Sequence, residues 1–252
     1  MKETPKIIHQ IWYQGGIPKK YEKSVYSWIT KNPSWKYVLW NKESARRLIP
    51  KFFIETYDSF PYDIQRIDAM RYFFLYLYGG VYVDMDVNCE KPLDGILEKN
   101  KLSFAPSAIR ESSLSNWMIH SPKGHPFWPK MWAAMIKSRN FPSFLGKHLV
   151  VMNTTGAALL TRTLKSTKTE YRILPRRKMI PCSICEPIPC KKPNPEAVVS
   201  FTKGQTWNKL DTFLINWFWC SRKGLIVFLL SLAIVVVLFL KNYVLCSCRS
   251  KV

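Results

Sequence analysis

Hydrophobic and polar residues follow a helical period before residue 79 and a strand-like period after it. In the segment Asp63–Tyr78, the apolar residues recur at the spacing of one helix face: Ile67, Met70, Phe74 and Leu77. From residue 80 to residue 87, apolar and polar side chains alternate, as in a strand with one buried face. Gly79 and Gly80 separate the two patterns, and glycine readily takes the positive φ that ends a helix. The pattern predicts a helix, a glycine stop and a strand.

Similar patterns predict strands and helices in alternation along most of the chain. The predicted strands are Lys6–Tyr13, Tyr37–Trp40, Gly80–Val87 and Leu102–Ala105. The predicted helices are Tyr21–Thr30, Lys42–Leu48, a short one within Pro50–Pro61, Asp63–Tyr78, Phe127–Lys137 and Thr155–Leu164. We therefore expect an α/β fold in which helices flank both faces of a mainly parallel, Rossmann-type sheet.

A long apolar run lies near the C-terminus. Leu225–Leu240 has no charged residue, and Ser231 is its one polar residue. We expect a transmembrane helix at residues 224–243 rather than a buried core helix, because the run has no amphipathic period. The preceding residues 213–223 are aromatic and basic, as in a juxtamembrane interface, and residues 244–252 form a short tail with cysteines and basic residues. Residues 1–212 then form the folded domain. The charges that flank the apolar run do not decide on which side of the membrane this domain lies.

Composition changes this picture in one respect. The 252 residues suffice for one sizeable domain and an appendage, and 38 Lys and Arg against 17 Asp and Glu give a net charge of +21. Such a charge favours an anionic partner: a phosphate-bearing substrate, a lipid surface or a nucleic acid. The basic residues are spread along the whole chain, and no nucleic-acid-binding motif is found, so we do not expect a nucleic acid as partner.

Three cysteines lie close together in the proline-rich segment Pro175–Pro195, which is predicted to be a loop. Cys182, Cys185 and Cys190 have the spacing Cys-x2-Cys-x4-Cys. A zinc site needs a fourth ligand, and no histidine follows His148. A loop with one disulfide, or with free thiols, is therefore favoured over zinc.

The acids at the end of the predicted strand Gly80–Val87 carry the strongest chemical signal. Asp84 and Asp86 repel each other unless a divalent cation neutralises them, and hard cations prefer oxygen ligands. A Mn²⁺ or Mg²⁺ ion held by two carboxylates leaves positions open for a diphosphate. In the preceding helix, Asp68, Arg71 and Tyr72 share a face. These residues together favour a metal–diphosphate site over an ordinary solvated turn.

At these residues the chain resembles glycosyltransferase family 32, whose sugar-binding region contains an Asp-x-Asp motif. The family includes inositol phosphorylceramide mannosyltransferases and α-1,6-mannosyltransferases. The resemblance covers about residues 5–207, and its other matching motifs are Pro5–Trp12, Ile17-Pro18, Ser27-Trp28, Asn32-Pro33, Leu39-Trp40, Pro61-Tyr62, Cys89–Asp94, Gly124–Phe127, Thr155-Gly156 and Gly204–Trp207. It implies a GT-A-like fold and a retaining glycosyltransferase.

The resemblance also implies roles on the donor side of the site. Asp86 coordinates the metal, and Asp84 contacts the metal shell or the ribose. Asp68 and Arg71 hold the donor sugar and the diphosphate; a surface ion pair on the helix is the alternative. The remaining donor-side candidates are Tyr82 beside the nucleotide, Trp12 stacked on the base or packed in the core, and Thr206 in the metal shell.

On the acceptor side, the resemblance implies a loop that contains Asn116 and His120, with Trp207 as a further candidate. A structural histidine is the alternative for His120. The chain departs from the family at residues 200–203, which read Ser-Phe-Thr-Lys, where a histidine is often found.

We therefore expect metal-dependent transfer of a hexose from a nucleotide diphosphate sugar to a membrane-bound acceptor. The resemblance implies GDP-mannose as donor, inositol phosphorylceramide or a glycan chain as acceptor, and a Golgi or other endomembrane location. Two alternatives from other classes remain open. One is a membrane protein that binds nucleotide sugar or lipid with little or no catalysis, and the other is a membrane-surface adaptor that acts through its charge.

Overall fold

The computed structural model describes residues 4–108, 113–182, 185, 190–191, 193–204, 210–221, 226 and 230. The chain divides into two compact units, residues 1–207 and residues 208–252, and each is described by itself. The predicted transferase domain, residues 1–212, ends close to the boundary between them.

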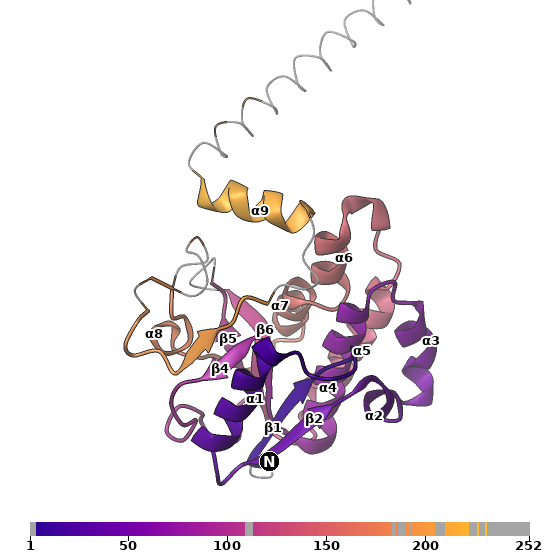
Figure 1. Cartoon of the computed structure of the whole chain (residues 1–252). Helices are drawn as coiled ribbons and strands as arrows, with labels where there is room; N and C mark the ends of the chain where they lie inside the picture. The colour runs from indigo at the N-terminus through magenta and orange to yellow at the C-terminus, as the bar shows by residue number, and fades with distance from the viewer. Residues whose placement is uncertain are drawn as a thin grey trace, which may run out of the picture. The chain divides into compact units, whose positions relative to one another are not determined.

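A six-stranded sheet, in the order β2-β1-β3-β6-β5-β7, forms the centre of the described part of the first unit (Figure 1). Its strands are β1 (Ile7–Ile11), β2 (Lys36–Trp40), β3 (Gly80–Val83), β5 (Ser103–Pro106), β6 (Leu114–Ser121) and β7 (Arg172–Ile173). All neighbouring strands are parallel except where β6 pairs antiparallel with β3 and β5. A smaller antiparallel pair joins β4 (Val87–Cys89) to β8 (Val199–Phe201). The expected α/β fold with a mainly parallel sheet is confirmed.

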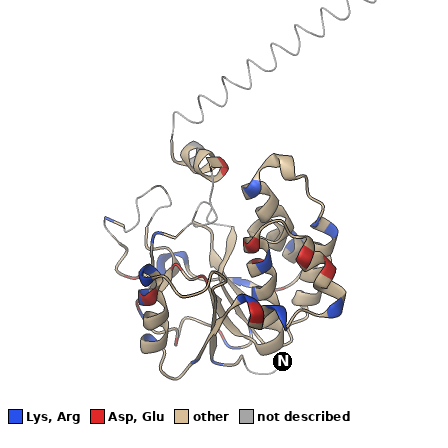
Figure 2. Ribbon diagram, turned by 45° about the vertical axis from the view of Figure 1, so that its right-hand side comes forward, with Lys and Arg blue, Asp and Glu red and all other residues tan. Residues whose placement is uncertain are grey.

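Helices cover both faces of this sheet. The helical elements of the first unit are α1 (Lys19–Lys31), α2 (Lys42–Arg46), α3 (Lys51–Ser59), α4 (Asp63–Tyr78), α5 (Phe127–Ser138), the 3₁₀ turn η1 (Ser143–Leu145), α6 (Lys147–Thr154), α7 (Ala157–Ser166) and α8 (Arg176–Met179). Lys and Arg residues lie on several of these helices, on both sides of the sheet (Figure 2).

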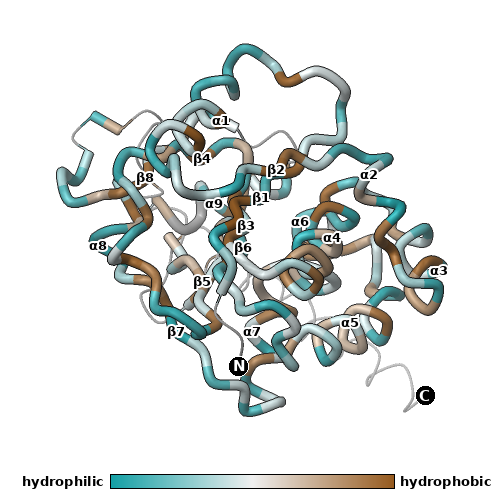
Figure 3. Tube along the Cα trace, turned by 90° about the horizontal axis from the view of Figure 1, so that it is seen from below, coloured by the Kyte–Doolittle hydropathy of each residue, from teal (hydrophilic) through white to brown (hydrophobic). Residues whose placement is uncertain are grey.

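The alternation of side chains in β3 divides the core into two layers. Val81 and Val83 pack with Trp28 of α1 on one face, and Tyr82 packs on the other face with the aromatic residues of α4 and α5. All of these side chains are buried, and the central strands β1 and β3 contain much of the hydrophobic sequence (Figure 3). The sheet is therefore buried on both faces, as expected for parallel strands.

Gly79 and Gly80 end helix α4 as the sequence predicts. Their φ angles are +68° and +94°, in the left-handed region. A Cβ on Gly80 would lie 2.3 Å from the carbonyl oxygen of Ile7 in β1, and one on Gly79 would lie 2.7 Å from the backbone nitrogen of Lys123. The two glycines are thus required both by their backbone angles and by the close approach of neighbouring backbone.

The environment of α4 differs from the predicted single apolar face. Its buried residues include Gln65, Asp68, Arg71 and Tyr72 as well as the apolar ones, and they lie on several sides of the helix. The reason is that α4 packs against β1, β3 and β6 of the sheet and also against α5 and α6. The polar residues of this helix are therefore inside the protein.

The prediction missed several elements between residues 110 and 205. Strand β6 is central in the sheet but contains serine, asparagine and histidine, and its alternation is irregular. Helix α6 was not predicted, and the predicted loop Pro175–Pro195 contains the short helix α8. The polar residues of β6 break the alternation from which a strand is predicted. They are found inside the protein because other protein groups, rather than water, pair with them.

Two of the three clustered cysteines form a disulfide between Cys182 and Cys190. Of the two alternatives favoured over zinc, a disulfide or free thiols, the disulfide is confirmed for this pair. In the described chain, no group of three or more His, Cys, Asp or Glu residues is arranged to hold a metal ion.

The second unit contains helix α9 (Leu210–Cys220), which overlaps the predicted juxtamembrane segment 213–223. Within the described residues, no helix combines the length and apolar character needed to cross a bilayer. The predicted transmembrane helix at 224–243 lies outside the described residues, apart from Ile226 and Leu230, and so does the tail at 244–252.

The native state holds two histidines, His9 and His120, in their neutral forms. Burial lowers the pKa of each from 6.5 to about 4. Both ring nitrogens of His9 are engaged, because Nε2 bonds the carbonyl oxygen of Gly79 and Nδ1 accepts the indole N–H of Trp40. A protonated ring would lose the second bond.

We expect the free energy of unfolding to fall as the pH is lowered from 6.5 to 4, because the unfolded chain protonates these imidazoles and the native state does not. Each histidine contributes about 3 kcal/mol of stability above pH 6.5 that is lost in this window. The raised pKa of Asp68, about 6, acts in the opposite direction. His120→Gln should therefore make the decline shallower in urea denaturation at about pH 6.5 and 4.5; an unchanged decline would contradict the assignment.

Candidate functional site

The Asp84-Met85-Asp86 segment forms a turn at the carboxyl end of β3. The backbone N–H of Asp84 donates to Trp117 (2.8 Å), and the N–H of Val87 closes the turn on the carbonyl of Asp84 (3.2 Å). The prediction of one continuous strand at Gly80–Val87 is therefore wrong. Pairing with β6 ends at Val83, and the chain then leaves the large sheet to begin β4. Both acids lie at the strand end as predicted, but on a turn.

Arg71 of α4 lies between two carboxylates behind this turn. Its guanidinium is 2.9 Å from Oδ1 of Asp68 and 3.2 Å from Oδ1 of Asp84, and its side chain is 2% exposed. The alternative of a surface ion pair on the helix is therefore wrong for Asp68 and Arg71. The three residues form an ion cluster, in which Asp68 and Arg71 are buried and Asp84 is partly exposed, and this cluster joins α4 to the Asp84–Asp86 turn.

Neighbouring polar groups complete the contacts of this cluster on the helix side. Asp68 accepts hydrogen bonds from Nδ2 of Asn116 (3.0 Å) and from Oγ1 of Thr155 (2.8 Å). The hydroxyl of Tyr72 donates to the carbonyl oxygen of Thr155 (2.7 Å). Helix α6, which ends next to Thr155, is thereby fastened to the same cluster as α4 and β6. Thr155 was recognised only as part of a family motif, without a role.

Tyr82 and Asn116 make the contacts on the strand side. The hydroxyl of Tyr82 donates to Oδ1 of Asp84 (2.8 Å), and the guanidinium of Arg71 lies 4.4 Å from the centre of the Tyr82 ring. Arg71 also donates to the carbonyl oxygen of Asn116 (2.5 Å). The structure thus brings together Asp68, Arg71, Tyr82, Asp84 and Asn116, five of the predicted site residues.

Burial and charge oppose each other in this cluster. Burial raises the pKa of Asp68 to about 6, although the facing Arg71 counteracts the shift. Burial also raises the pKa of Asp84, against the same guanidinium. For Arg71, burial is the largest single influence and disfavours the charged form, but Asp84, Tyr82, Asp68 and Tyr72 together outweigh it and the pKa is raised. The guanidinium is therefore permanently charged, and it keeps the two carboxylates close together.

Asp86 lies against the chain segment that follows β8. The N–H of Thr202 donates to the carbonyl oxygen of Asp86 (2.8 Å). A Cβ on Gly204 would lie 2.2 Å from Oδ2 of Asp86, so only glycine leaves room for this carboxylate. The pairing of β8 with β4 produces this approach between residues far apart in the sequence. Thr206 and Trp207, predicted for the metal shell and the acceptor, lie outside the described residues.

The chemistry of the turn fits a hard divalent cation. Two carboxylates from one turn supply oxygen ligands, and Gly204 leaves room for the carboxylate of Asp86. Tyr82 and Arg71 both contact the Asp84 carboxylate at Oδ1, and the side chain is 32% exposed. Few protein ligands suit Mg²⁺ or Mn²⁺, whose remaining positions are taken by water and phosphate oxygens. Asp84 and Asp86 are the residues that would hold the ion.

The other predicted site residues have structural contacts. Trp12, just after β1, is half-buried; its indole N–H donates to Gly16 (3.0 Å), and its ring packs edge-on against Tyr21. His120 is 2% exposed, and its Nδ1 bonds the carbonyl oxygen of Lys101 (3.0 Å). The prediction that Asn116 and His120 lie on a loop is wrong, because both belong to β6.

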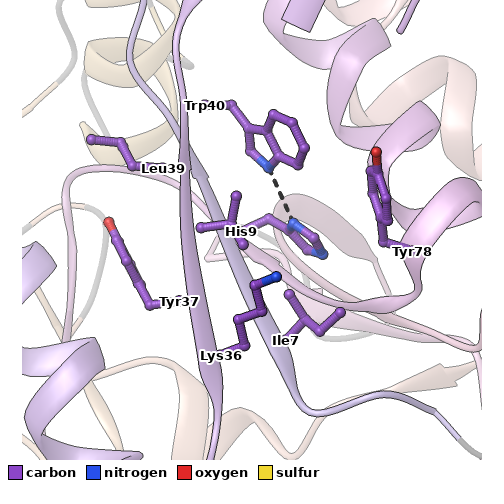
Figure 4. Close-up of a pocket in the computed structure, with 8 residues that line it drawn as sticks. Ile7, His9, Lys36, Tyr37, Leu39, Trp40 and Tyr78 are labelled. Carbon is purple, nitrogen blue, oxygen red and sulfur yellow. Dashed lines mark hydrogen bonds between the residues drawn. The ribbon is translucent and has the colours of Figure 1, made fainter. Parts of the chain in front are cut away.

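A separate cavity of about 450 Å³ lies along β1 and β2 (Figure 4). Its lining includes His9, Lys36, Trp40 and Tyr78, and none of the predicted site residues among the described ones. The Trp40 indole lies parallel to Phe74 at 4.2 Å and donates to His9, so these aromatic groups are already packed together. This cavity is therefore not part of the site at the Asp84–Asp86 turn, whose residues do not line it.

Comparison with known proteins identifies the class to which this fold and site belong. Residues 18–103, which include the Asp84–Asp86 turn, match the family described as a glycosyltransferase sugar-binding region containing a DXD motif. The PaToxG glycosyltransferase has a similar structure, with a TM-score of 0.50 and 16% identity over 66% of this chain and 70% of that one. The latter similarity shows a shared glycosyltransferase fold of the GT-A-like type.

Two relatives from the yeast Schizosaccharomyces pombe are more specific. Inositol phosphoceramide mannosyltransferase 3 is 40% identical over 167 residues, which are 62% of this chain and 44% of that protein. Inositol phosphoceramide mannosyltransferase 1 is 29% identical over 249 residues, which are 95% of this chain and 73% of that protein. The chain thus spans less than half of the first relative and about three quarters of the second.

The buried position of Arg71 predicts a large effect of its removal on stability. Arg71→Met should lower the free energy of unfolding by about 3–5 kcal/mol, because Asp68 then remains buried without its partner. Arg47→Met is the matched control: Arg47 pairs with Glu43 on α2, the two side chains are 75% and 74% exposed, and the loss should stay below about 1 kcal/mol. Urea denaturation measures both, and equal losses would contradict a buried ion cluster.

Proposed function

We propose that the protein transfers a hexose from a nucleotide diphosphate sugar to a membrane-bound acceptor, with a bound Mn²⁺ or Mg²⁺ ion. The observation that carries this proposal is the turn at the carboxyl end of β3, where Asp84 is held by Arg71 and Asp86 lies two residues further on, against Thr202 and Gly204. Ligands of open α/β sheets bind at this end of the strands. The match of residues 18–103 to a glycosyltransferase family supports a role of the turn in binding a nucleotide sugar.

The residues of the chain would divide the work as follows. When bound, the ion neutralises the negative charge that develops on the departing diphosphate. Asp84 is held by Tyr82 and Arg71, so its carboxylate keeps one orientation. Arg71 is buried and engaged, so in this structure it positions Asp84 rather than facing solvent. A pre-oriented carboxylate reduces the reorganisation needed when the donor binds.

Mannose, inositol phosphorylceramide and retention of configuration are the finer parts of the proposal. The names of the two yeast relatives support mannose as the sugar and inositol phosphoceramide as the acceptor. The acceptor's phosphate suits a chain with a net charge of +21. GDP-mannose as the donor, and retention, follow from the resemblance to glycosyltransferase family 32 and are proposed on that ground.

The Cys182–Cys190 disulfide bears on location. Disulfides persist in oxidising compartments such as the endomembrane lumen and are rare in the cytosol. We therefore propose that the first unit faces the lumen of the Golgi or another endomembrane compartment, with the apolar C-terminal segment as its membrane anchor. The flanking charges by themselves leave the orientation undecided, and the disulfide supports a lumenal position of the first unit.

The proposal predicts manganese-dependent binding of the donor. GDP-mannose at about a hundred times its Kd, with MnCl₂, should stabilise the protein by about 2.7 kcal/mol and raise its melting temperature. Asp86→Asn should abolish this shift with little change in the melting temperature of the free protein. Glu22→Gln, which removes an exposed acid from α1, should leave the shift intact.

Activity assays then separate the alternatives. Mannose transfer to inositol phosphorylceramide, and not to a mannose oligosaccharide, supports the lipid acceptor, whereas the reverse result supports a glycan acceptor. Binding of the donor without transfer or hydrolysis supports a non-catalytic binding protein. Absence of any manganese-dependent nucleotide binding, together with vesicle binding that survives Asp84→Ala and Asp86→Ala and falls steeply with salt, supports the adaptor and overturns the proposal.

A further inference from the structure

A second pocket, of about 320 Å³, lies next to the Asp84–Asp86 turn. Residues of α1, β4 and β8 line it, together with the chain on both sides of the disulfide loop. The ones that matter for its chemistry are Lys23, Asn88, Cys190, Ser200, Thr202 and Lys203. It contains none of the residues assigned above to the metal.

The charge of this pocket is positive. Lys23 and Lys203 are both exposed, and no Asp or Glu is found among its described lining residues. In the described part of the chain, neither lysine has a carboxylate within ion-pair distance, although many other basic residues do. Two unpaired ammonium groups around one hollow favour a bound anion.

The polar wall between the lysines is held rigidly. Asn88 is 3% exposed, and its amide donates to Oγ of Ser200 and to Oγ1 of Thr202, both at 3.1 Å. Ser200 in turn donates to the carboxylate of Glu90. On another side, the disulfide fixes Cys190 to Cys182. Side chains that are already ordered lose little entropy when a ligand binds.

Lys203 connects this pocket to the candidate active site. It is the residue between Thr202, whose N–H donates to the carbonyl of Asp86, and Gly204, which faces the carboxylate of Asp86. A group bound at Lys203 would therefore lie close to the turn that is proposed to bind the metal and the donor. A substrate with one anionic group at the Asp84–Asp86 turn could then place a second anionic group in the pocket.

We propose that this pocket binds a phosphate group of a phosphorylated substrate through Lys23 and Lys203. The inference rests on the proposed function for the identity of the substrate, but not for the chemistry of the pocket. An ammonium group binds phosphate as a compact point charge through charge-assisted hydrogen bonds. The phosphate has two possible sources, the phosphodiester headgroup of the acceptor and the diphosphate of the donor.

Binding measurements with the full chain test the proposal. The probes are myo-inositol 1-phosphate, phosphate-free myo-inositol, and GDP with MnCl₂, each titrated calorimetrically. Lys23→Gln and Lys203→Gln should each weaken the binding of a phosphate probe about three- to tenfold, and the double variant should weaken it further. The loss should shrink as salt rises, because the lysines are exposed.

Lys165→Gln is the matched control, since it removes an exposed lysine from α7 and should leave all affinities unchanged. Equal melting temperatures of all variants exclude loss of folding. Weaker binding of myo-inositol 1-phosphate assigns the pocket to the acceptor, and weaker binding of GDP assigns it to the donor.

The proposal is overturned if the double variant binds both phosphate probes as the unchanged protein does, or if the unchanged protein binds neither. Its failure is distinct from failure of the proposed function. Lysine-dependent binding of inositol phosphate without any response to GDP-mannose and manganese would keep the pocket and reject the transferase. Manganese-dependent donor binding without an effect of the two lysines would do the opposite.

Discussion

The contact of Arg71 with Asp68 and Asp84 is the interaction on which the site depends. A guanidinium with 2% exposure would be costly by itself, and so would a buried carboxylate. Pairing the two opposite charges lowers the free-energy cost of burying each of them. The same contacts also join helix α4 to the turn after β3. Asp84 therefore has its orientation determined by the core of the protein, while its neighbour Asp86 remains half-buried at the rim.

The glycine pair before β3 makes this arrangement possible. Because Gly80 lies so close to Ile7 that no side chain would fit, β3 can pair directly with β1 at the point where α4 ends. Helix and strand then run side by side, and Arg71 reaches back to the strand's far end. The same short connection places Tyr82 under the guanidinium, where its ring and hydroxyl both contribute. Local backbone geometry and side-chain electrostatics thus support each other.

The second half of the site comes from the other end of the folded unit. Strand β8 pairs with β4 and brings Thr202 and Gly204 against Asp86. The two acids of the turn therefore have different surroundings, since one contacts the ion cluster of α4 and the other a glycine of the returning chain. This division gives one short turn a carboxylate that the core holds in place and a second one at the rim, beside the returning chain.

The sequence by itself determined the features that depend on neighbouring residues. These are the length of α4, the positive φ angles of Gly79 and Gly80, the position of Asp84 and Asp86 at a strand end, and the mainly parallel sheet, because periodicity and glycine chemistry act over a few residues. Tertiary structure decided whether Asp68 and Arg71 are on the surface or buried, and whether Asn116 lies on a loop or on β6. Their hydrogen-bond partners are supplied by distant segments, such as Thr155 just after α6. A sequence does not show whether water or another part of the protein pairs with a polar residue.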